Sequence, residues 1–116
     1  MSDGVPLTSK FVLLTDGNKV RLVTTANISI LRADGNYTNI WLDDGTHFLI
    51  TRSLSKIAEH LDNCMFFRAN RSCIINLGAV SHIRLYGKNL VVALKNNNDE
   101  ILVSRQQVRI LKGLKL

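Results

Sequence analysis

The stretch Phe66–Ile83, F-F-R-A-N-R-S-C-I-I-N-L-G-A-V-S-H-I, combines a buried-strand pattern with a tight group of polar and cationic side chains. The apolar run at residues 73–75 predicts a strand in the core. The polar side chains directly before this run are Arg68, Asn70, Arg71 and Ser72. Because a buried strand holds its neighbours in place, this stretch supplies both a fold determinant and the first candidate site.

Arginine and asparagine at fixed positions carry the donors and acceptors that DNA base edges require. Arginine can form two hydrogen bonds with guanine, and asparagine can form two with adenine. A polar turn that leads into a strand, with Arg68 and Arg71 in solvent, accounts for the same residues equally well. The stretch alone leaves both interpretations open.

Positive charge is concentrated in the second half of the chain. Residues 1–65 hold six Lys and Arg against seven Asp and Glu, a net charge of −1. Residues 66–116 hold nine against two, a net charge of +7. This asymmetry favours a polyanionic partner such as nucleic acid. Many soluble domains are modestly basic, so the charge adds only modest support for a nucleic-acid partner.

Length and composition indicate one folded domain. A chain of 116 residues that is 46% hydrophobic can bury its own core. We expect an N-terminal tail at residues 1–8 and a domain at residues 9–116. The tail lacks a secretory signal and no apolar run could span a bilayer, so a cytoplasmic location is expected. We expect no disulfide between Cys64 and Cys73, and we expect Cys73 in the core.

Three Asp-Gly pairs divide the first half of the chain into short strands, because this pair favours the tight turns of hairpins. The predicted strands cover residues 11–14, 19–23, 28–32, 37–41 and 47–50. Three such turns in succession predict an antiparallel meander and an all-β fold rather than a helical domain.

A helical period begins after Ser53. Apolar residues at i, i+3, i+4 and i+7 from Leu54 predict a short helix of about two and a half turns, with Ser53 as N-cap and Asp62-Asn63 as its end. Strands are then predicted at residues 80–85, 89–94 and 100–103, and a helix at 105–114. We expect burial of residues 73–75 and of Val91, Ile101 and Val103.

Eight positions in the opening stretch resemble the signature of the LytTR-type (LytR/AlgR) DNA-binding domain, an output domain of bacterial transcription regulators. These positions are Phe66, Arg68, Arg71, Ser72, Ile75, Asn76, Val80 and Ile83. The segments 28–37, 54–61 and 103–107 follow the same family pattern, so the resemblance extends over about residues 11–111. It implies an elongated fold of several antiparallel sheets with one short central helix and a short C-terminal helix.

The resemblance also implies that loops, rather than a recognition helix, enter successive major grooves of double-stranded DNA. The family's contact positions correspond here to Asn70, Arg71 and Ser72, to Arg105 and Gln106, and to Asn36, Tyr37 and Thr38. Arg68 belongs to the same candidate site. The chain departs from the common family form at Asn70, where an imidazole is frequent. It also departs at Arg32, where an acid is frequent and where the arginine adds positive charge near the loop at Asp34.

Four further cations are candidates either for general phosphate contacts or for a solvated face: Arg84, Lys88, Lys95 and Arg109. Among them Lys88 is included with the candidate DNA-binding residues. Phosphate contacts fix the position of a protein on the duplex, whereas base contacts specify sequence.

Alternatives from other classes remain open at this point. Short strands, basic charge and the early aromatics Tyr37 and Trp41 are compatible with an OB-type barrel for single-stranded nucleic acid or a small ligand, although Trp41 between apolar neighbours favours core packing. A protein-interaction module is also possible. The three histidines lie in no nucleophile or metal motif, so we expect no enzyme, no metal and no cofactor.

The resemblance implies two copies of the domain on a pair of short direct repeats. It also implies a regulatory partner, which could be a membrane-bound inhibitor or a phosphoacceptor receiver domain outside this chain. Neither the operator nor the dimer contact follows from the residues.

Overall fold

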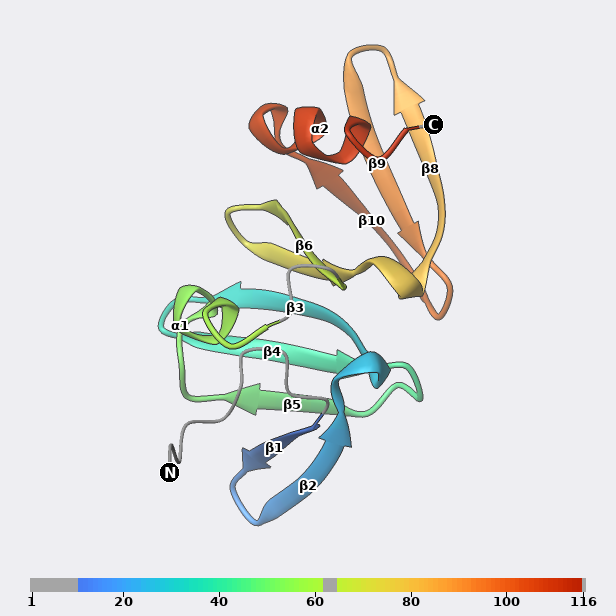
Figure 1. The fold of residues 1–116 in the computed structure, drawn as a ribbon. Coiled ribbons are helices and arrows are strands. Elements are labelled where there is room, and N and C mark those ends of the chain that lie inside the picture. Colours follow the sequence, from blue (N-terminus) through green and yellow to red (C-terminus); the bar gives the residue numbers. More distant parts are fainter. Residues whose placement is uncertain (1–10, 62–64, 116) are drawn as a thin grey trace, which may run out of the picture.

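The computed structural model describes residues 11–61 and 65–115 (Figure 1). Within these residues the chain forms mostly β-strands, with one short helix in the middle and one at the C-terminal end. The predicted tail at residues 1–8, the predicted helix end at Asp62-Asn63 and Cys64 lie outside the described residues.

The strands form three separate antiparallel sheets. The middle sheet has the order β5-β4-β3-β7-β6 and consists of β3 (Ile28–Asp34), β4 (Tyr37–Leu42), β5 (His47–Ile50), β6 (Phe66–Asn70) and β7 (Cys73–Asn76). A hairpin joins β1 (Phe11–Asp16) to β2 (Lys19–Thr24), and β8 (Val80–Tyr86), β9 (Asn89–Leu94) and β10 (Asn97–Val103) form a sheet of order β10-β9-β8. The helices are α1 (Leu54–Ala58) and α2 (Arg105–Lys112). The predicted mainly β fold with two short helices is confirmed.

The sheets are stacked along the long axis of the molecule, which measures 46 × 32 × 24 Å. Figure 1 shows the three-stranded sheet and α2 at one end, the five-stranded sheet in the middle and the β1–β2 hairpin at the other end. The strands of the described residues therefore do not close into one barrel, and the OB-type alternative is wrong as a description of the fold.

Both faces of the middle sheet are buried at its centre. Leu31 and Ile74 belong to the cluster that packs against the β1–β2 hairpin and α1. Their neighbours Ile30, Cys73 and Ile75 point to the opposite face and pack with the three-stranded sheet and α2. Because successive side chains of a strand alternate between faces, the continuous apolar run at residues 73–75 serves two cores at once.

Asn76 ends β7 and is a buried polar residue with a structural role. Its Nδ2 donates to the carbonyls of Ala26 (3.0 Å) and Ile28 (2.8 Å), and its Oδ1 accepts from the backbone N–H of Gly78 (2.8 Å). These bonds tie the start of β3 to the 3-10 turn Leu77–Ala79, which leads into β8. The asparagine of the signature therefore connects two of the three sheets.

The β1–β2 hairpin is anchored by its charged side chains. Asp16 accepts from the backbone N–H of Leu49 (3.0 Å), Lys19 donates to the carbonyl of His47, and Arg21 pairs with Asp44 (3.2 Å). The hydroxyl and backbone N–H of Thr46 and the Arg21 guanidinium lower the pKa of Asp44 to about 2. The hairpin thus directs its charges onto β5 and the β4–β5 turn.

Several sequence-based details need correction, while the cap is confirmed. Ser53 Oγ accepts from the backbone N–H of Lys56, as expected of an N-cap. The helix itself ends at Ala58 and is shorter than predicted. In β9 the fully buried valine is Val92, whereas Val91 is only half-buried. Because Val91 and Val92 are both valine, the sequence does not show which of them faces the core. The pairing of β9 with β8 and β10 decides this.

Candidate nucleic-acid interface

The turn between β6 and β7 carries the first group of predicted site residues. Arg68 lies beneath this turn, where its Nε donates to the carbonyl of Asn70 (3.3 Å) and its Nη2 to the carbonyl of Arg71 (2.6 Å). Asn70 Oδ1 accepts from the backbone N–H of Ser72 (2.9 Å). The side chains of Arg68 and Asn70 therefore hold the turn, whereas Arg71 and Ser72 are exposed at its tip.

The start of α2 is attached to this same turn. The backbone N–H of Ser104 donates to the carbonyl of Ala69 (2.8 Å), and Gln107 Nε2 donates to the carbonyl of Arg68 (2.7 Å). Asn70 Nδ2 also donates to the carbonyl of Leu102 (2.7 Å), in the strand that leads into the helix. These three bonds fix the start of α2 against the β6–β7 turn.

Arg105 and Gln106 are exposed in the first turn of α2. This turn contains no acidic residue, and the Ser104 side chain makes no capping hydrogen bond. The backbone N–H groups and the partial positive charge of a helix N-terminus favour anions such as phosphate. Two exposed polar side chains and an anion-attracting helix end therefore lie together.

The β3–β4 turn is the third place that the sequence singled out. The backbone N–H of Ala33 donates to the carbonyl of Ser72 (2.8 Å), which joins this turn to the β6–β7 turn. Gly35 has a positive φ of 61°, as a tight hairpin turn requires. Asn36 and Tyr37 are exposed beside it, and Tyr37 keeps 48% of its surface in solvent.

Thr38 does not fit its predicted role as a DNA contact. Its side chain is completely buried, and its hydroxyl donates to the carbonyl of Arg52 (2.8 Å). Thr38 lies on the same face of β4 as the core residues Ile40 and Leu42, because side chains two apart share a face. Its hydroxyl is therefore part of the scaffold beneath the turn.

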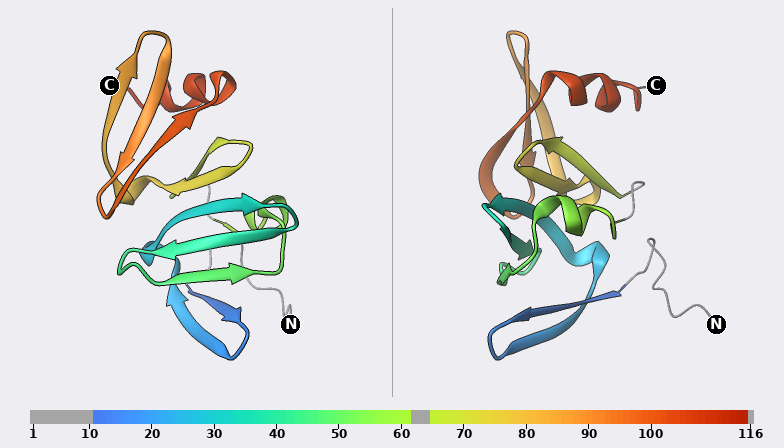
Figure 2. Two further views of the ribbon diagram at one scale, coloured as in Figure 1. Left: turned by 180° about the vertical axis from the view of Figure 1, so that it is seen from behind. Right: turned by 90° about the vertical axis from the view of Figure 1, so that its left-hand side faces the viewer.

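The three places form one connected edge of the molecule. Hydrogen bonds link the β3–β4 turn to the β6–β7 turn, and the β6–β7 turn to the start of α2. In Figure 1 these elements follow one another along the left side, and in the rear view of Figure 2 they lie on the right. Ala33 and Asp34 are exposed at this edge, together with the predicted site residues Asn36, Tyr37, Arg71, Ser72, Arg105 and Gln106.

The remaining cations divide into paired and exposed groups. Arg32 pairs with Asp99 (3.3 Å), so its charge is compensated and the positive contribution expected near Asp34 is reduced. Arg84 pairs with Glu100 and lies over the Tyr86 ring, with its Cζ 5.1 Å from the ring centroid. Lys95 donates to the carbonyl of Gly78 (3.2 Å).

Lys88 is exposed in the β8–β9 turn, at the far end of the three-stranded sheet (Figure 1). Arg109 is exposed on α2. Neither residue belongs to the hydrogen-bonded edge. Both residues stay candidates either for general phosphate contacts or for a solvated face.

Cys73 is a buried free thiol, as predicted, and burial raises its pKa to about 11. Within residues 11–61 and 65–115 no group of His, Cys, Asp and Glu has the arrangement of a metal site. No helix in the same described residues is long and apolar enough to cross a membrane.

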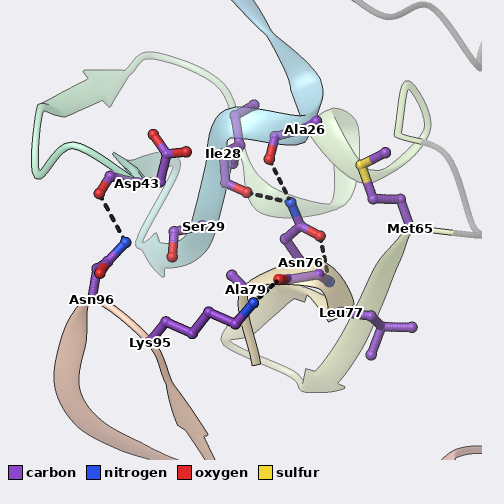
Figure 3. Close-up of a pocket in the computed structure, with 11 residues that line it drawn as sticks. Ala26, Ile28, Ser29, Asp43, Met65, Asn76, Leu77, Ala79, Lys95 and Asn96 are labelled. Carbon is purple, nitrogen blue, oxygen red and sulfur yellow. Dashed lines mark hydrogen bonds between the residues drawn. The ribbon is translucent and has the colours of Figure 1, made fainter. Parts of the chain in front are cut away.

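A pocket of about 510 Å³ lies between the middle sheet and the three-stranded sheet (Figure 3). It is lined by the start of β3, the β7–β8 connection, Asp43 and the β9–β10 turn. The side-chain amides of the two asparagines in this pocket already form hydrogen bonds. Asn76 makes the bonds described above, and Asn96 Nδ2 donates to the carbonyl of Asp43 (3.1 Å). β3 runs from this pocket to the β3–β4 turn over seven residues, so the pocket and that turn are roughly 20 Å apart.

Sequence reasoning missed the structural roles of Gln107 and Asn70. Gln107 was considered only as part of the family pattern at residues 103–107, and Asn70 only as a base reader. Side-chain bonds to distant backbone carbonyls, such as Gln107 to Arg68 or Asn70 to Leu102, depend on how the sheets stack. The only available signal was that both residues flank exposed arginines in the family pattern.

Three comparisons with known proteins place this chain. Residues 18–115 match the family model of the LytTr DNA-binding domain. The CO-responsive transcriptional regulator RcoM of Rhodospirillum rubrum is 31% identical over 102 residues, which cover 84% of this chain and 42% of that protein. The chain therefore spans less than half of the regulator that it matches.

A solved structure agrees with the same assignment. It is described as the LytTr DNA-binding domain of a putative methyl-accepting/DNA response regulator from Bacillus cereus, with a TM-score of 0.78 and 19% sequence identity, and the match covers 91% of this chain and 96% of that one. At this identity the likeness shows the fold. Together with the family match over residues 18–115, the fold and the signature show that the chain belongs to the LytTR family of DNA-binding domains.

Proposed function

We propose that this domain binds double-stranded DNA sequence-specifically, by inserting its exposed loops into the major groove, and that it acts within a bacterial transcription regulator at promoter direct repeats. The observation that carries the proposal is the hydrogen-bonded edge that joins the β3–β4 turn, the β6–β7 turn and the start of α2. Loops held in this way can present side chains to DNA at fixed spacing.

In this proposal the base readers are Arg71, Arg105 and Gln106. Each side chain is exposed, and neither arginine forms an ion pair with a residue in the ranges 11–61 and 65–115. Arginine suits guanine and glutamine suits adenine, each through two hydrogen bonds. Ser72, Asn36 and Tyr37 carry the hydroxyl and amide groups that bind phosphate oxygens and fix the register of the protein on DNA.

Arg68 and Asn70 act as positioning residues rather than as readers. Both amide atoms of Asn70 and both bonded nitrogens of Arg68 are engaged with backbone groups of the turn or of β10. A side chain that gave up these bonds to reach a base would release the turn that carries Arg71. Where other family members frequently carry an imidazole, this chain has Asn70, and in this proposal its amide has a structural role.

Two copies of the domain on neighbouring repeats, in the cytoplasm where bacterial promoters are, complete the proposal. The net charge of +7 in residues 66–116 supports attraction to the phosphate backbone. A regulatory input through another protein or another domain is expected, because a DNA-binding domain alone carries no sensor. Catalysis is not part of the proposed function.

The test is selection of a random double-stranded DNA library on the purified domain at about physiological salt, followed by titration of the selected site. A repeated motif that binds at least about 1,000-fold more tightly than its scrambled version supports the proposal. Equal retention of single strands or of scrambled duplex contradicts it. The Arg71→Ala and Arg105→Ala variants on single-base variants of the site then assign each arginine to a base.

A further inference from the structure

The β1–β2 hairpin exposes an apolar face to solvent. Residues that pair across the two strands share a face, so Leu13 and Leu22 lie together with Phe11, Thr15 and Val20 on one side. The exposed fractions are 54% for Phe11, 62% for Leu13, 58% for Val20 and 64% for Leu22. We call this the outer face, and its large side chains are Phe11, Leu13, Val20 and Leu22.

The charges of the hairpin all lie on the opposite side. Asp16, Lys19 and Arg21 belong to the inner face, where they bond to β5 and the β4–β5 turn while Leu14 and Val23 enter the core. A two-stranded ribbon on a core ordinarily turns its polar residues outward. In this hairpin the charged side chains bond toward β5 and the β4–β5 turn, although Lys19 and Arg21 stay exposed, and the large apolar side chains of the other face are in water.

We propose that the outer face is a self-association surface that a second copy of this chain covers. Figure 1 and the side view of Figure 2 show the hairpin at one end of the described molecule, beyond β5. The two copies pair through the same face, in the two-fold arrangement that most homodimers adopt.

Charge favours a second copy at this face over other parts of the surface. The chain has a net charge of +6, so two copies repel each other wherever their charged surfaces meet. The outer face carries no charged residue, and the three charges of the hairpin are held on its other side. Two outer faces can therefore approach each other without juxtaposing like charges.

The area of the face indicates weak pairing. Four large side chains that are each more than half exposed present on the order of 100 Å² apiece, so two facing copies cover roughly 800 Å² of apolar surface before the rim is counted. This is the low end of specific interfaces, and the dissociation constant is expected in the micromolar range or above. An exposed apolar patch of this size on a folded domain commonly marks an interaction site.

The pairing is independent of the proposed DNA binding. The outer face contains none of the exposed residues of the candidate interface, and those residues belong to other elements. Because a two-fold dimer matches inverted rather than direct repeats, the pairing proposed here concerns the DNA-free domain. Loss of pairing and loss of DNA binding can be measured separately on the same variants.

Sedimentation equilibrium of the DNA-free domain, from about 10 µM to about 1 mM, tests the proposal. The wild-type chain is expected to shift from monomer to dimer across this range. Leu22→Glu places like charges against each other and is expected to raise the dissociation constant by tenfold or more. The matched control is Leu85→Glu, because Leu85 is 68% exposed on β8 at the other end of the molecule. This substitution should leave the dissociation constant of the dimer unchanged.

A charge-swap experiment makes the test specific to pairing. Leu22→Glu and Leu22→Lys chains should each remain monomeric, and an equimolar mixture should recover the dimer because opposite charges then meet across the interface. Far-ultraviolet circular dichroism and the melting temperature check that both variants are folded. A wild-type chain that is monomeric throughout, a dimer unaffected by Leu22→Glu, or a dimer lost with Leu85→Glu would each overturn the proposal.

Discussion

Asn70→Ala should separate a structural asparagine from one that reads a base. The side chain makes two hydrogen bonds, from Nδ2 to the carbonyl of Leu102 (2.7 Å) and from the Ser72 N–H to Oδ1 (2.9 Å). Alanine removes both bonds and leaves the two backbone groups to water. The variant therefore loosens the β6–β7 turn and its attachment to β10.

The expected loss of stability follows from these two bonds. Each hydrogen bond contributes about 0.5 to 1.5 kcal/mol to the free energy of unfolding. Because the turn is accessible to solvent, the two bonds together should contribute about 1 to 2 kcal/mol. For a domain of this size the melting temperature should fall by roughly 4 to 8 °C. Reordering the loosened turn on DNA should cost about 1 kcal/mol more, or about fivefold in affinity for every sequence alike.

The assay pairs urea denaturation with titration of the selected site and of its single-base variants. Asn36→Ala is the matched control, because Asn36 is exposed at the same edge in the β3–β4 turn and should change stability by no more than about 0.5 kcal/mol. An Asn70→Ala protein of wild-type stability that loses discrimination at one base pair would refute the structural role. Asn70 would then be a reader, as the residue type alone suggested.

Three further outcomes are expected. Arg71→Ala should leave stability within about 0.5 kcal/mol and reduce specific binding by about 1 to 3 kcal/mol, as measured by denaturation and by operator titration. Lys88→Ala should weaken binding to all duplexes alike and reduce the slope of log K against log salt by about 0.9; relaxed discrimination would instead make Lys88 a reader. In a Cys64→Ser background, iodoacetamide should leave Cys73 unmodified until the protein unfolds. Because the Cys73 pKa is raised from 9.0 to about 11, the stability from its buried neutral thiol is complete below pH 9 and should be lost as the pH rises toward 11.

The turns and the order of strands could be predicted because local chemistry determines them. Gly17, Gly35 and Gly45 all adopt positive φ, and each follows an aspartate in a pair that favours tight turns. The N-cap at Ser53 and the buried Cys73 follow from equally local patterns. Together with the apolar run at residues 73–75, these features placed β3, β4, β5 and β7 of the middle sheet, whereas β6 was not predicted as a strand.

Features that depend on pairing between distant strands could not be predicted. Val91 and Val92 are chemically identical, and only the register with β8 and β10 selects Val92 for the core. The bonds of Asn70 and Gln107 reach residues 32 and 39 positions away, across the boundary between two sheets. Thr38 is different, because its alternation with Ile40 and Leu42 was visible in the sequence and already indicated an inward side chain.

The bonds that hold the β6–β7 turn come from side chains other than those exposed at its tip. Arg68, Asn70 and Gln107 bind backbone atoms, which every residue possesses, so they hold the turn whatever side chain occupies position 71 or 105. A related domain could therefore acquire a new operator by changing its exposed residues one at a time, without passing through an unstable intermediate. Recognition in such a domain can diverge quickly while its scaffold stays constant.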